Sequence, residues 1–408
     1  MKHIYLIGEH LSHSYSPKIH SCLAGYSYSL KELAREAVSD FFAKREFDGL
    51  NVTIPYKKEV MRYLDAISPE AEAIGAVNTV LRQGSTLIGY NTDYFGFMAM
   101  VRKSGVTVQG KTVVVIGSGG ASKAVCAALS DMGAGAVKVL SHKDNNEEAI
   151  HAYTDCHVLV NTSPVGMYPN SDAAPVDLSL FTCCEAVLDL IYNPAQTRLL
   201  EEAERLGMVS CNGLYMLVAQ AKKAAEIFSG QAICDSRIDE VCKMMELETK
   251  NIVLIGMPGC GKTTVGRKLA ELLSREFYDS DSEIEAAFGM HPSAFITEKG
   301  EQAFRAAESE VLCRLGKQSG CIIATGGGAV TRQENYSFLR QNSTVVFLKR
   351  ELDALATDNR PLSKDKAAIE ALFKTRLPLY RQFCHVEVEA AESPALTAKE
   401  IIKKVKEL

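Results

Sequence analysis

The sequence predicts an α/β protein of two or three domains built on parallel sheets. Short apolar runs rich in β-branched residues alternate with helical segments along the whole chain, a pattern typical of parallel strands joined by crossover helices. The 408 residues exceed what one hydrophobic core usually organises. Two glycine-rich loops, within residues 111–124 and 251–266, each follow such a run. They differ in spacing, so they indicate two chemistries and not a duplication.

Composition excludes several classes of function. The chain is 47% hydrophobic and 23% charged, with a formal net charge of −5, a poor match for nucleic acid or an anionic membrane surface. It has no apolar run of roughly 20 residues that would span a bilayer. The segment "MKHIYLIGEHLSHS" is too polar after Ile7 for a signal peptide and is expected to form the first strand.

Twelve cysteines are scattered without C-x-x-C or paired Cys/His spacing. This pattern favours reduced thiols in the cytoplasm over disulfides or a zinc site. We therefore expect a cytoplasmic protein, with a homo-oligomer as an open possibility.

The strand-like runs appear in a regular order. They read "HIYLIG", "GLNVTIP", "TVVVIG", "AVKVLS", "HVLVNT", "EAVLDLIY", "NIVLIG", "CIIATGGG" and "STVVFLK". Residues 214–228 have helical spacing and few breakers. We place the main boundary near 247–250, where a charged run without Gly or Pro precedes a fresh strand. A Gly/Ser spacer, which would let the halves move freely, is absent there.

The second glycine loop, "GMPGCGKTT", fits a triphosphate-binding loop. Gly256, Gly261, Lys262 and Thr263 satisfy G-x-x-x-x-G-K-[ST] between a strand and the helical segment "VGRKLAELLS". In such a loop backbone N–H groups and the helix N-terminus hold phosphates, the lysine reaches the β/γ oxygens, and the threonine holds magnesium. The motif leaves the phosphoryl acceptor undetermined.

Two further segments of this half carry candidate residues. In "FYDSDSEIE", Asp279 and Asp281 are two apart, so on a strand both would face one side; a solvated turn with a helix N-cap is the alternative. Gly326 to Gly328 follow a strand and permit close backbone approach to a small ligand, or they form a tight turn.

Three arginines complete the candidates. Arg305 lies in "GEQAFRAAESE", Arg376 in "RLPLYRQ", and Arg360 precedes a proline in "DNRPLSKD", a plausible mobile lid. An exposed arginine without a role is the alternative for Arg360.

The second half of the chain resembles shikimate kinase over essentially all of residues 250–390. The resemblance lies in six motifs in this order: GMPGCGKTT, DSD, FR, GGG, RPL and R-x-P-x-Y. The resemblance implies that Asp281, Arg305, Gly327 and Arg376 bind shikimate, with the planar guanidinium groups on its carboxylate. It implies that Asp281 accepts the 3-hydroxyl proton, Lys262 and Arg360 act on the transferring phosphoryl group, and Thr263 and Asp279 support Mg2+. The nucleotide-binding residues it implies are Gly256, Gly259, Cys260, Gly261, Lys262, Thr263 and Thr264.

The first loop, "VVVIGSGGASKA", is an imperfect dinucleotide-binding motif. Gly117, Gly119 and Gly120 end a strand, and Ser122 stands where a third glycine would be. The next strand run ends in residues 141–143, Ser-His-Lys, which suit the 2′-phosphate of NADP better than the ribose of NAD. A solvated polar turn is the alternative, and Asp144 follows directly.

The first 100 residues contain polar side chains suited to binding a polyhydroxylated acid. They include Ser14 and Ser16, the pair Thr53 and Lys57, and the series Asn78, Asn91 and Asp93. A lysine beside an aspartate can move a proton at a carbonyl while a hydride arrives. Taken singly, most of these residues also fit surface charges, turn formers or a helix N-cap region.

The first half of the chain resembles shikimate dehydrogenase over about residues 4–235. The resemblance lies in these motifs taken together: S-x-S-P, NVT-x-P-x-K, GAVNT, NTD, GSGGAS, "NTSPVGM", "DLIYNPAQT" and "NGLYMLVAQ". The resemblance implies Lys57 and Asp93 as the catalytic pair. The substrate residues it implies are Ser14, Ser16, Thr53, Lys57, Asn78, Asp93, Gln220 and, near the nicotinamide, Tyr192. The cofactor residues it implies are Gly117, Ser118, Gly119, Gly120, Ala121, Ser141, His142, Lys143 and Gly213.

The chain departs from the dehydrogenase pattern in three places. Tyr215 replaces a small residue after Gly-Leu, which would alter packing at the nicotinamide end. Residues 141–143 replace the usual Asn-Arg-Thr, which implies weaker NADP affinity than is typical. The region between His20 and Gly49 is shorter than expected.

Both loops make sense if they serve consecutive steps. We expect a two-lobed dehydrogenase, with a substrate lobe at 1–100 completed by 213–246 and a Rossmann-type NADP lobe at 101–212, followed by a P-loop α/β kinase domain at 250–408. NADPH would reduce 3-dehydroshikimate, and Mg-ATP would then phosphorylate shikimate. Two alternatives stay open: a P-loop switch fused to a dehydrogenase, and activity on quinate or another hydroxy acid.

Overall fold

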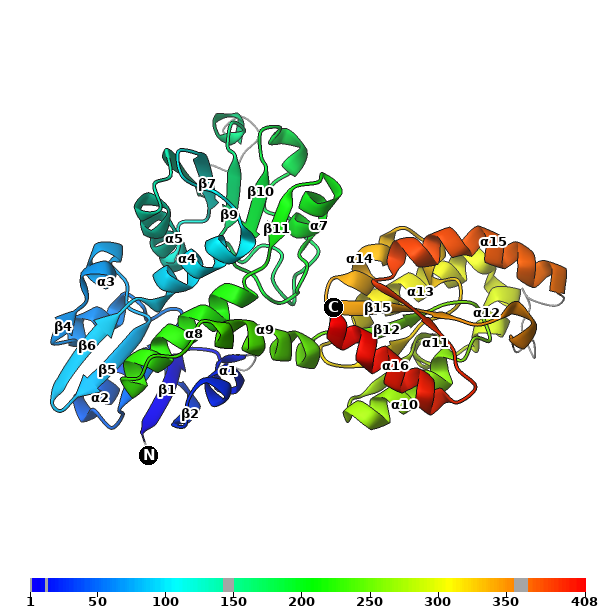
Figure 1. Ribbon diagram of the computed structural model, residues 1–408, viewed down its shortest axis with the longest axis horizontal. Coiled ribbons are helices and arrows are strands. Elements are labelled where there is room, and N and C mark those ends of the chain that lie inside the picture. The colour runs from blue at the N-terminus through cyan, green and yellow to red at the C-terminus, as the bar shows by residue number, and fades with distance from the viewer. Residues whose placement is uncertain (1, 12–13, 142–149, 356–365) are drawn as a thin grey trace. The chain divides into compact units, whose positions relative to one another are not determined.

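The computed structural model describes residues 2–11, 14–141, 150–355 and 366–408 (Figure 1). Strands and helices alternate, as expected for the α/β class. The chain divides into two compact units, one of Met1–Tyr192 with Thr197–Met245 and one of Asn193–Gln196 with Glu246–Leu408. None of the described helices is long and apolar enough to cross a membrane.

The first unit begins with a six-stranded sheet in the order β2-β1-β3-β5-β6-β4. Its strands are β1 (His3–Gly8), β2 (Ser27–Glu32), β3 (Gly49–Val52), β4 (Ala66–Ile67), β5 (Thr79–Gln83) and β6 (Thr86–Tyr90). The helices within this segment are α1 (Ser16–Leu23), α2 (Ala37–Lys44), α3 (Pro69–Ile74) and the 3-10 helix η1 (Glu59–Tyr63).

This sheet corrects the expectation of parallel pairing throughout. The strand β5 runs antiparallel to both β3 and β6. Its hairpin with β6 turns at Gly84, whose φ of +62° lies in the left-handed region that favours glycine. Two apolar runs separated by Gly-Ser were a hairpin signal that the strand prediction overlooked.

The same unit continues into a five-stranded sheet in the order β11-β10-β9-β7-β8, in which every pairing is parallel. Its strands are β7 (Thr112–Ile116), β8 (Ala136–Leu140), β9 (Val158–Asn161), β10 (Ala186–Asp189) and β11 (Val209–Cys211). All four residues of β9 and of β10 are buried, as is usual for parallel strands covered on both faces. The elements around it are α4 (Thr92–Ser104), α5 (Gly120–Asp131), η2 (His151–Tyr153), η3 (Leu178–Leu180) and α7 (Arg198–Arg205).

After the second sheet the chain returns to the first. The helix α8 (Leu214–Ser229) confirms the helical prediction for 214–228, and it lies beside α4 (Figure 1). Phe228 near its end is fully buried and packs in one cluster with Ile4 of β1 and Leu81 of β5. A further helix, α9 (Ser236–Thr249), follows.

The second unit is built on a parallel sheet in the order β13-β14-β12-β15-β16. Its strands are β12 (Asn251–Ile255), β13 (Phe277–Asp279), β14 (Ile322–Ala324), β15 (Ser343–Lys349) and β16 (Val386–Glu389). Its helices are α10 (Lys262–Leu273), α11 (Ser280–Phe288), α12 (Pro292–Lys299), α13 (Glu301–Gly316), α14 (Glu334–Arg340), α15 (Lys366–Phe383) and α16 (Pro394–Glu407), with the 3-10 helices η4 (Ala329–Thr331) and η5 (Leu352–Ala354). In open α/β sheets ligands bind beyond the carboxyl ends of the strands, where the loop between β12 and α10 lies.

Candidate active sites

A lysine–aspartate ion pair joins the first sheet to helix α4. Lys57 follows β3, and its Nζ lies 2.6 Å from Oδ2 of Asp93. The Lys57 and Asp93 side chains are 19% and 12% exposed, so the ion pair is mostly buried but remains in contact with solvent. Asn91 caps α4 by accepting a hydrogen bond from Tyr94 N, which puts Asp93 in the first turn, where the helix dipole favours a carboxylate.

The same pair lies beside the first glycine loop. A Cβ placed on Gly120 would lie 3.9 Å from Cδ of Lys57. The structure therefore brings the predicted proton-transfer residues next to the predicted dinucleotide loop, although the two lie far apart in the sequence and belong to different sheets.

Other predicted substrate residues are connected to Asp93 through its neighbour Thr92. Asn78 Oδ1 accepts from Thr92 N at 2.7 Å, and Asn78 Nδ2 donates to Thr92 Oγ1 at 3.0 Å. Thr92 Oγ1 in turn lies 3.3 Å from Oε1 of Gln220 on α8. Asn78 is only 3% exposed, so much of its amide is already engaged within the protein.

The predicted serines lie at the start of α1, close to the predicted nicotinamide-side tyrosine. Ser14 Oγ accepts from Ser16 N at 3.3 Å. Tyr15 between them contacts Tyr192, with ring centroids 5.3 Å apart. Burial raises the pKa of Tyr192, so its hydroxyl keeps its proton. Thr53 directly follows β3, and its N–H donates to Ile7 O at 3.0 Å.

The first glycine loop has the geometry of a phosphate-binding turn. Gly117 has a φ of +104°, and a Cβ there would lie 2.8 Å from Oγ1 of Thr162, so only glycine fits. Helix α5 begins at Gly120 after Gly119, which has no neighbour within 4 Å of an added Cβ. The loop residues Ser118 and Ala121 flank this point, and open N–H groups at a helix N-terminus suit an anion.

Two other predicted cofactor residues follow strands of the same sheet. Ser141 follows β8, next to Leu140, whose carbonyl accepts from Gly117 N at 2.9 Å. Gly213 N donates to Ile191 O at 2.9 Å, and a Cβ on Gly213 would collide with the Leu190 carbonyl. His142 and Lys143 lie outside the described residues.

A buried carboxylate holds the loops around Tyr192 together. Asp189 at the end of β10 accepts hydrogen bonds from Asn161 Nδ2, Ile191 N and Thr197 Oγ1 at 2.9, 3.0 and 2.8 Å. Burial raises the pKa of Asp189 to about 6, and the three hydrogen bonds oppose part of that rise. The sequence reasoning did not single out Asp189.

In the second unit three glycines shape the loop between β12 and α10. Gly256, Gly259 and Gly261 have φ values of +147°, +83° and +99°, which side-chain-bearing residues rarely adopt. Lys262 is 8% exposed, and its Nζ donates to the carbonyls of Gly256 and Met257, both at 2.9 Å. Thr264 follows in the first turn of α10, and Cys260 is buried at the base of the loop.

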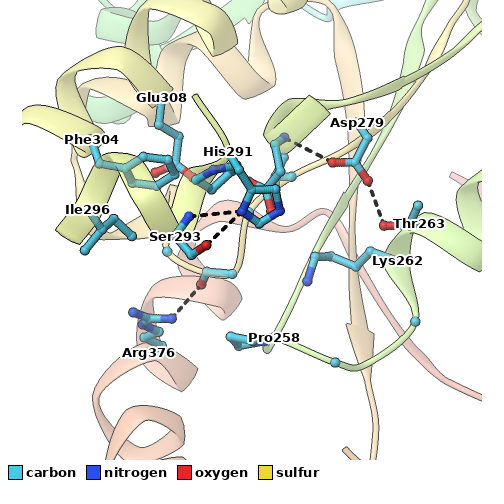
Figure 2. Close-up of a pocket in the computed structure, with 18 of the residues that line it drawn as sticks. Pro258, Lys262, Thr263, Asp279, His291, Ser293, Ile296, Phe304, Glu308 and Arg376 are labelled. Atoms are coloured by element: carbon cyan, nitrogen blue, oxygen red, sulfur yellow. Dashed lines mark hydrogen bonds between the residues drawn. The ribbon is translucent and has the colours of Figure 1, made fainter. Parts of the chain in front are cut away.

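Asp279 serves two partners at the edge of this loop. One carboxylate oxygen accepts from Asp281 N at 3.0 Å and caps α11, and the other accepts from Thr263 Oγ1 at 2.7 Å (Figure 2). The N-cap alternative is therefore correct for Asp279. The argument from strand alternation is wrong, because β13 ends at Asp279 and Asp281 lies in the first turn of α11.

Both aspartates nevertheless line one cavity of about 630 Å³, a size usual for small-ligand sites. The predicted residues on its wall are Gly259, Gly261, Lys262, Thr263, Thr264, Asp279, Asp281, Arg305, Gly327 and Arg376. Burial raises the pKa of Asp281, the charge of Asp279 adds to the rise, and Lys262 and Arg305 oppose it. Such a carboxylate is better suited to accept a proton than an exposed one.

An ion pair inside the cavity fixes Arg305. Its Nη1 donates to Glu308 Oε2 at 2.6 Å, and its Nη2 to Glu301 Oε1 at 3.3 Å. The Arg305 side chain is 11% exposed and Glu308 is fully buried. Burial raises the pKa of Glu308, and the charge of Arg305 opposes that rise. The sequence reasoning missed Glu308; its signal was the i,i+3 spacing from Arg305 on a helix.

The three consecutive glycines bring loops together. Gly327 O accepts from Arg376 Nη1 at 3.1 Å and from the Tyr380 hydroxyl at 2.6 Å. A Cβ on Gly327 would lie 2.6 Å from Pro258 of the second glycine loop, and one on Gly328 would collide with the Arg305 guanidinium. These glycines thus allow close approach to the phosphate loop and to a substrate-type arginine, more than a tight turn requires.

Residues that the sequence reasoning did not name also line the cavity. His291 caps α12, with its Nδ1 2.8 Å from Ser293 Oγ, and both side chains lie at the cavity wall (Figure 2). Arg350 after β15 lines it as well. No local pattern marks these three, because their role depends on which loops meet. Arg360 lies outside the described residues.

The folds and sites together define a chain that joins a dinucleotide-dependent dehydrogenase to a P-loop kinase. Residues 6–80 match the family model described as shikimate dehydrogenase substrate binding domain, and residues 258–406 match the model described as shikimate kinase. The NADP(+)-dependent shikimate dehydrogenase of Clostridium beijerinckii is 39% identical over 243 residues, which are 55% of this chain and 90% of the relative.

Solved structures agree with this relationship. Shikimate dehydrogenase 1 from Peptoclostridium difficile is 38% identical, with a TM-score of 0.56 over 61% of this chain and 99% of that chain. Shikimate 5-dehydrogenase from Thermus thermophilus, solved with NADP(H) and shikimate, is 32% identical, with a TM-score of 0.54 over 60% and 99%. The chain belongs to the shikimate dehydrogenase family, carries a shikimate kinase domain at its C-terminal end, and is a bifunctional enzyme of the shikimate pathway.

Proposed function

We propose that the first half reduces 3-dehydroshikimate to shikimate with NADPH and that the second half phosphorylates the 3-hydroxyl of shikimate with Mg-ATP. One observation carries the proposal: in each half, side chains that can transfer protons lie beside a glycine loop of the phosphate-binding type. Lys57 and Asp93 lie beside Gly120, and Asp281 shares one cavity with Lys262.

We propose three domain limits: a substrate lobe of residues 1–100 completed by 213–246, an NADP lobe of 101–212, and a kinase domain of 250–408. They are supported by the distribution of the strands, since β1–β6 and α8 lie within the first, β7–β11 within the second and β12–β16 within the third.

In the dehydrogenase half, Lys57 donates a proton to the substrate's carbonyl oxygen, and Asp93 holds the ammonium group in place at 2.6 Å. The nicotinamide, when bound, supplies the hydride. Ser14, Ser16, Thr53, Asn78, Tyr192 and Gln220 surround the substrate. The open turn at Gly117, Gly119 and Gly120 fits a pyrophosphate, because its glycines leave room for close backbone approach.

In the kinase half, Arg305 and Arg376 hold the acceptor's carboxylate, and Asp281 takes the proton of the 3-hydroxyl as the phosphoryl group arrives. Lys262 and the backbone N–H groups of residues 256–264 hold the phosphates. Thr263 Oγ1 and Asp279 Oδ2 lie next to each other and are oxygen ligands of the kind that Mg2+ prefers. The ion, when bound, would neutralise phosphate charge. Arg360, which lies outside the described residues, is the further residue we assign to the transferred phosphoryl group.

One coupled assay tests both activities. The chain is given 3-dehydroshikimate, NADPH and ATP, and cofactor oxidation and shikimate 3-phosphate are followed in the same tube. Omission of NADPH should stop both signals, and omission of ATP should stop only the second. ATP hydrolysis that does not depend on shikimate would favour the P-loop switch instead, and equal turnover with quinate would refute the assignment of shikimate.

Cofactor choice is tested separately. Because Ser141, His142 and Lys143 suit a 2′-phosphate, kcat/KM should be higher with NADPH than with NADH. Equal values would refute the role given to these residues.

A further inference from the structure

A buried hydrogen-bond chain runs through the edge of the first sheet, starting on α1. His20 is 1% exposed and stacks on Tyr28 of β2, with ring centroids 4.0 Å apart and an interplanar angle of 11°. The Tyr28 hydroxyl donates to Oδ1 of Asn51 on β3 at 2.9 Å. Asn51 is 6% exposed, so its amide depends on protein partners.

The direction of these hydrogen bonds is determined by burial. Burial lowers the pKa of His20 to about 3 and raises the pKa of Tyr26 and of Tyr28, so the imidazole is neutral and both phenols keep their protons. The Tyr26 hydroxyl, 2.5 Å from His20 Nδ1, therefore donates to it. The other ring nitrogen of His20 then carries the proton.

Asn51 then has one possible amide orientation. Its Oδ1 accepts from Tyr28, while its Nδ2 donates to Thr79 Oγ1 at 3.0 Å and to the carbonyl of Asn78 at 3.4 Å. A flipped amide would place its oxygen against the carbonyl of Asn78, which can only accept. The partners of Asn51 therefore fix the orientation of its amide.

This network ends on one residue of the proposed substrate site, Asn78. Asn51 Nδ2 donates to the carbonyl of Asn78 at 3.4 Å, and Thr79 Oγ1, which accepts from Asn51 Nδ2, donates to Asn78 Oδ1 at 3.1 Å. The Tyr28 hydroxyl is thus connected to Asn78 through Asn51. The Tyr26 hydroxyl bonds to His20 instead.

We propose that Tyr28 is a positioning residue for the dehydrogenase reaction, whose hydroxyl sets the placement of Asn78 through Asn51. The inference rests on the proposed function, because the placement of Asn78 matters only if the first half binds a polyhydroxylated acid. Tyr28 itself makes no contact with substrate. Its loss weakens ground-state and transition-state binding alike, which raises KM and leaves kcat.

The test uses the full chain and Tyr28→Phe, which keeps the ring that stacks on His20 and removes only the hydroxyl. KM for 3-dehydroshikimate should rise about five- to tenfold, the effect of losing one net hydrogen bond. The kcat, the KM for NADPH and the kinase constants of the same molecule should stay at wild-type values. Tyr26→Phe is the matched control: it should lower the melting temperature without changing KM.

A double-mutant comparison separates positioning from loss of fold. Asn78→Ala with Tyr28→Phe should raise KM no further than Asn78→Ala alone, because Tyr28 acts on the substrate only through Asn78. An unchanged KM in Tyr28→Phe, or effects of the two substitutions that multiply, overturns the proposal while the proposed function stands. A wild-type chain that does not turn over 3-dehydroshikimate overturns both.

Discussion

The buried carboxylate of Asp189 leads to a prediction about pH and stability. Its pKa rises from the ordinary value of 3.8 to about 6 because burial disfavours the charged form. Asp189→Asn keeps the shape of the group: Oδ1 still accepts from Asn161 and Ile191, and the new NH2 donates to Thr197 Oγ1. The variant therefore differs from the wild type mainly in having no ionisable group at residue 189.

The sign follows from proton linkage. Between pH 3.8 and 6 the unfolded chain has released the proton of Asp189 and the folded chain retains it, so stability falls as pH rises. The interval 6 − 3.8 is about two pH units, and each is equivalent to 1.36 kcal/mol. The wild type therefore carries about 3 kcal/mol of stability below pH 4 that is lost above pH 6 to 7, and the variant does not lose it.

The measurement is the difference in unfolding free energy between Asp189→Asn and wild type from pH 4 to pH 8. Urea unfolding followed by circular dichroism provides it, and the two enzyme activities report which half has unfolded. As pH rises, the unfolding free energy of Asp189→Asn should increase relative to that of the wild type by about 3 kcal/mol. In thermal unfolding, each kcal/mol corresponds to roughly 2–4 °C of melting temperature. A difference that is constant over this range would refute the reasoning.

Asp177→Asn is a control of opposite sign. Asp177 is exposed, and its hydrogen bonds from Ser179 Oγ and N lower its pKa. Its contribution is present above the unfolded pKa and is lost as pH falls through the folded one. The variant should therefore lose a little stability relative to wild type near neutral pH and none in acid.

Two further predictions use one half of the chain as the control for the other, and a third compares the two ligands of the kinase half. Lys57→Ala should lower dehydrogenase kcat by about 10²- to 10⁴-fold and leave kinase activity intact; loss of both would contradict separate sites. Asp281→Asn should stop shikimate phosphorylation while NADPH oxidation continues, and a kinase that keeps its kcat would exclude Asp281 as the base. Gly328→Ala places a methyl group against the Arg305 guanidinium, so KM for shikimate should rise with KM for ATP unchanged; a change in the ATP constant alone would contradict that placement.

Local motifs predicted the parts of this protein that depend on short stretches of chain. The loop at residues 256–263 is a glycine-rich strand–loop–helix segment in the structure, because positive φ values and helix-start chemistry are encoded within a few residues. The apolar runs of β7, β9, β10 and β12 were recognisable for the same reason, as short buried strands flanked by turn residues.

Features that depend on distant contacts were missed or misread. The antiparallel β5 was overlooked because its partners, not its own composition, set its direction. For Asp279 and Asp281 the sequence left a shared strand face and a helix N-cap both open, and the structure shows that helix α11 starts between them. Glu308 was passed over because a glutamate on a helix surface and one buried against Arg305 have the same sequence pattern.

The sequence by itself determined the α/β class, the two glycine loops and the ordered motifs that mark both enzyme families, because each is written in neighbouring residues. Only the tertiary structure decided that Lys57 lies beside Gly120, that Glu308 is the buried partner of Arg305, and that Tyr28 and Asn51 share one hydrogen-bond chain. The reason is physical: burial, pKa and hydrogen-bond direction arise from groups that meet only when separate strands and helices pack together.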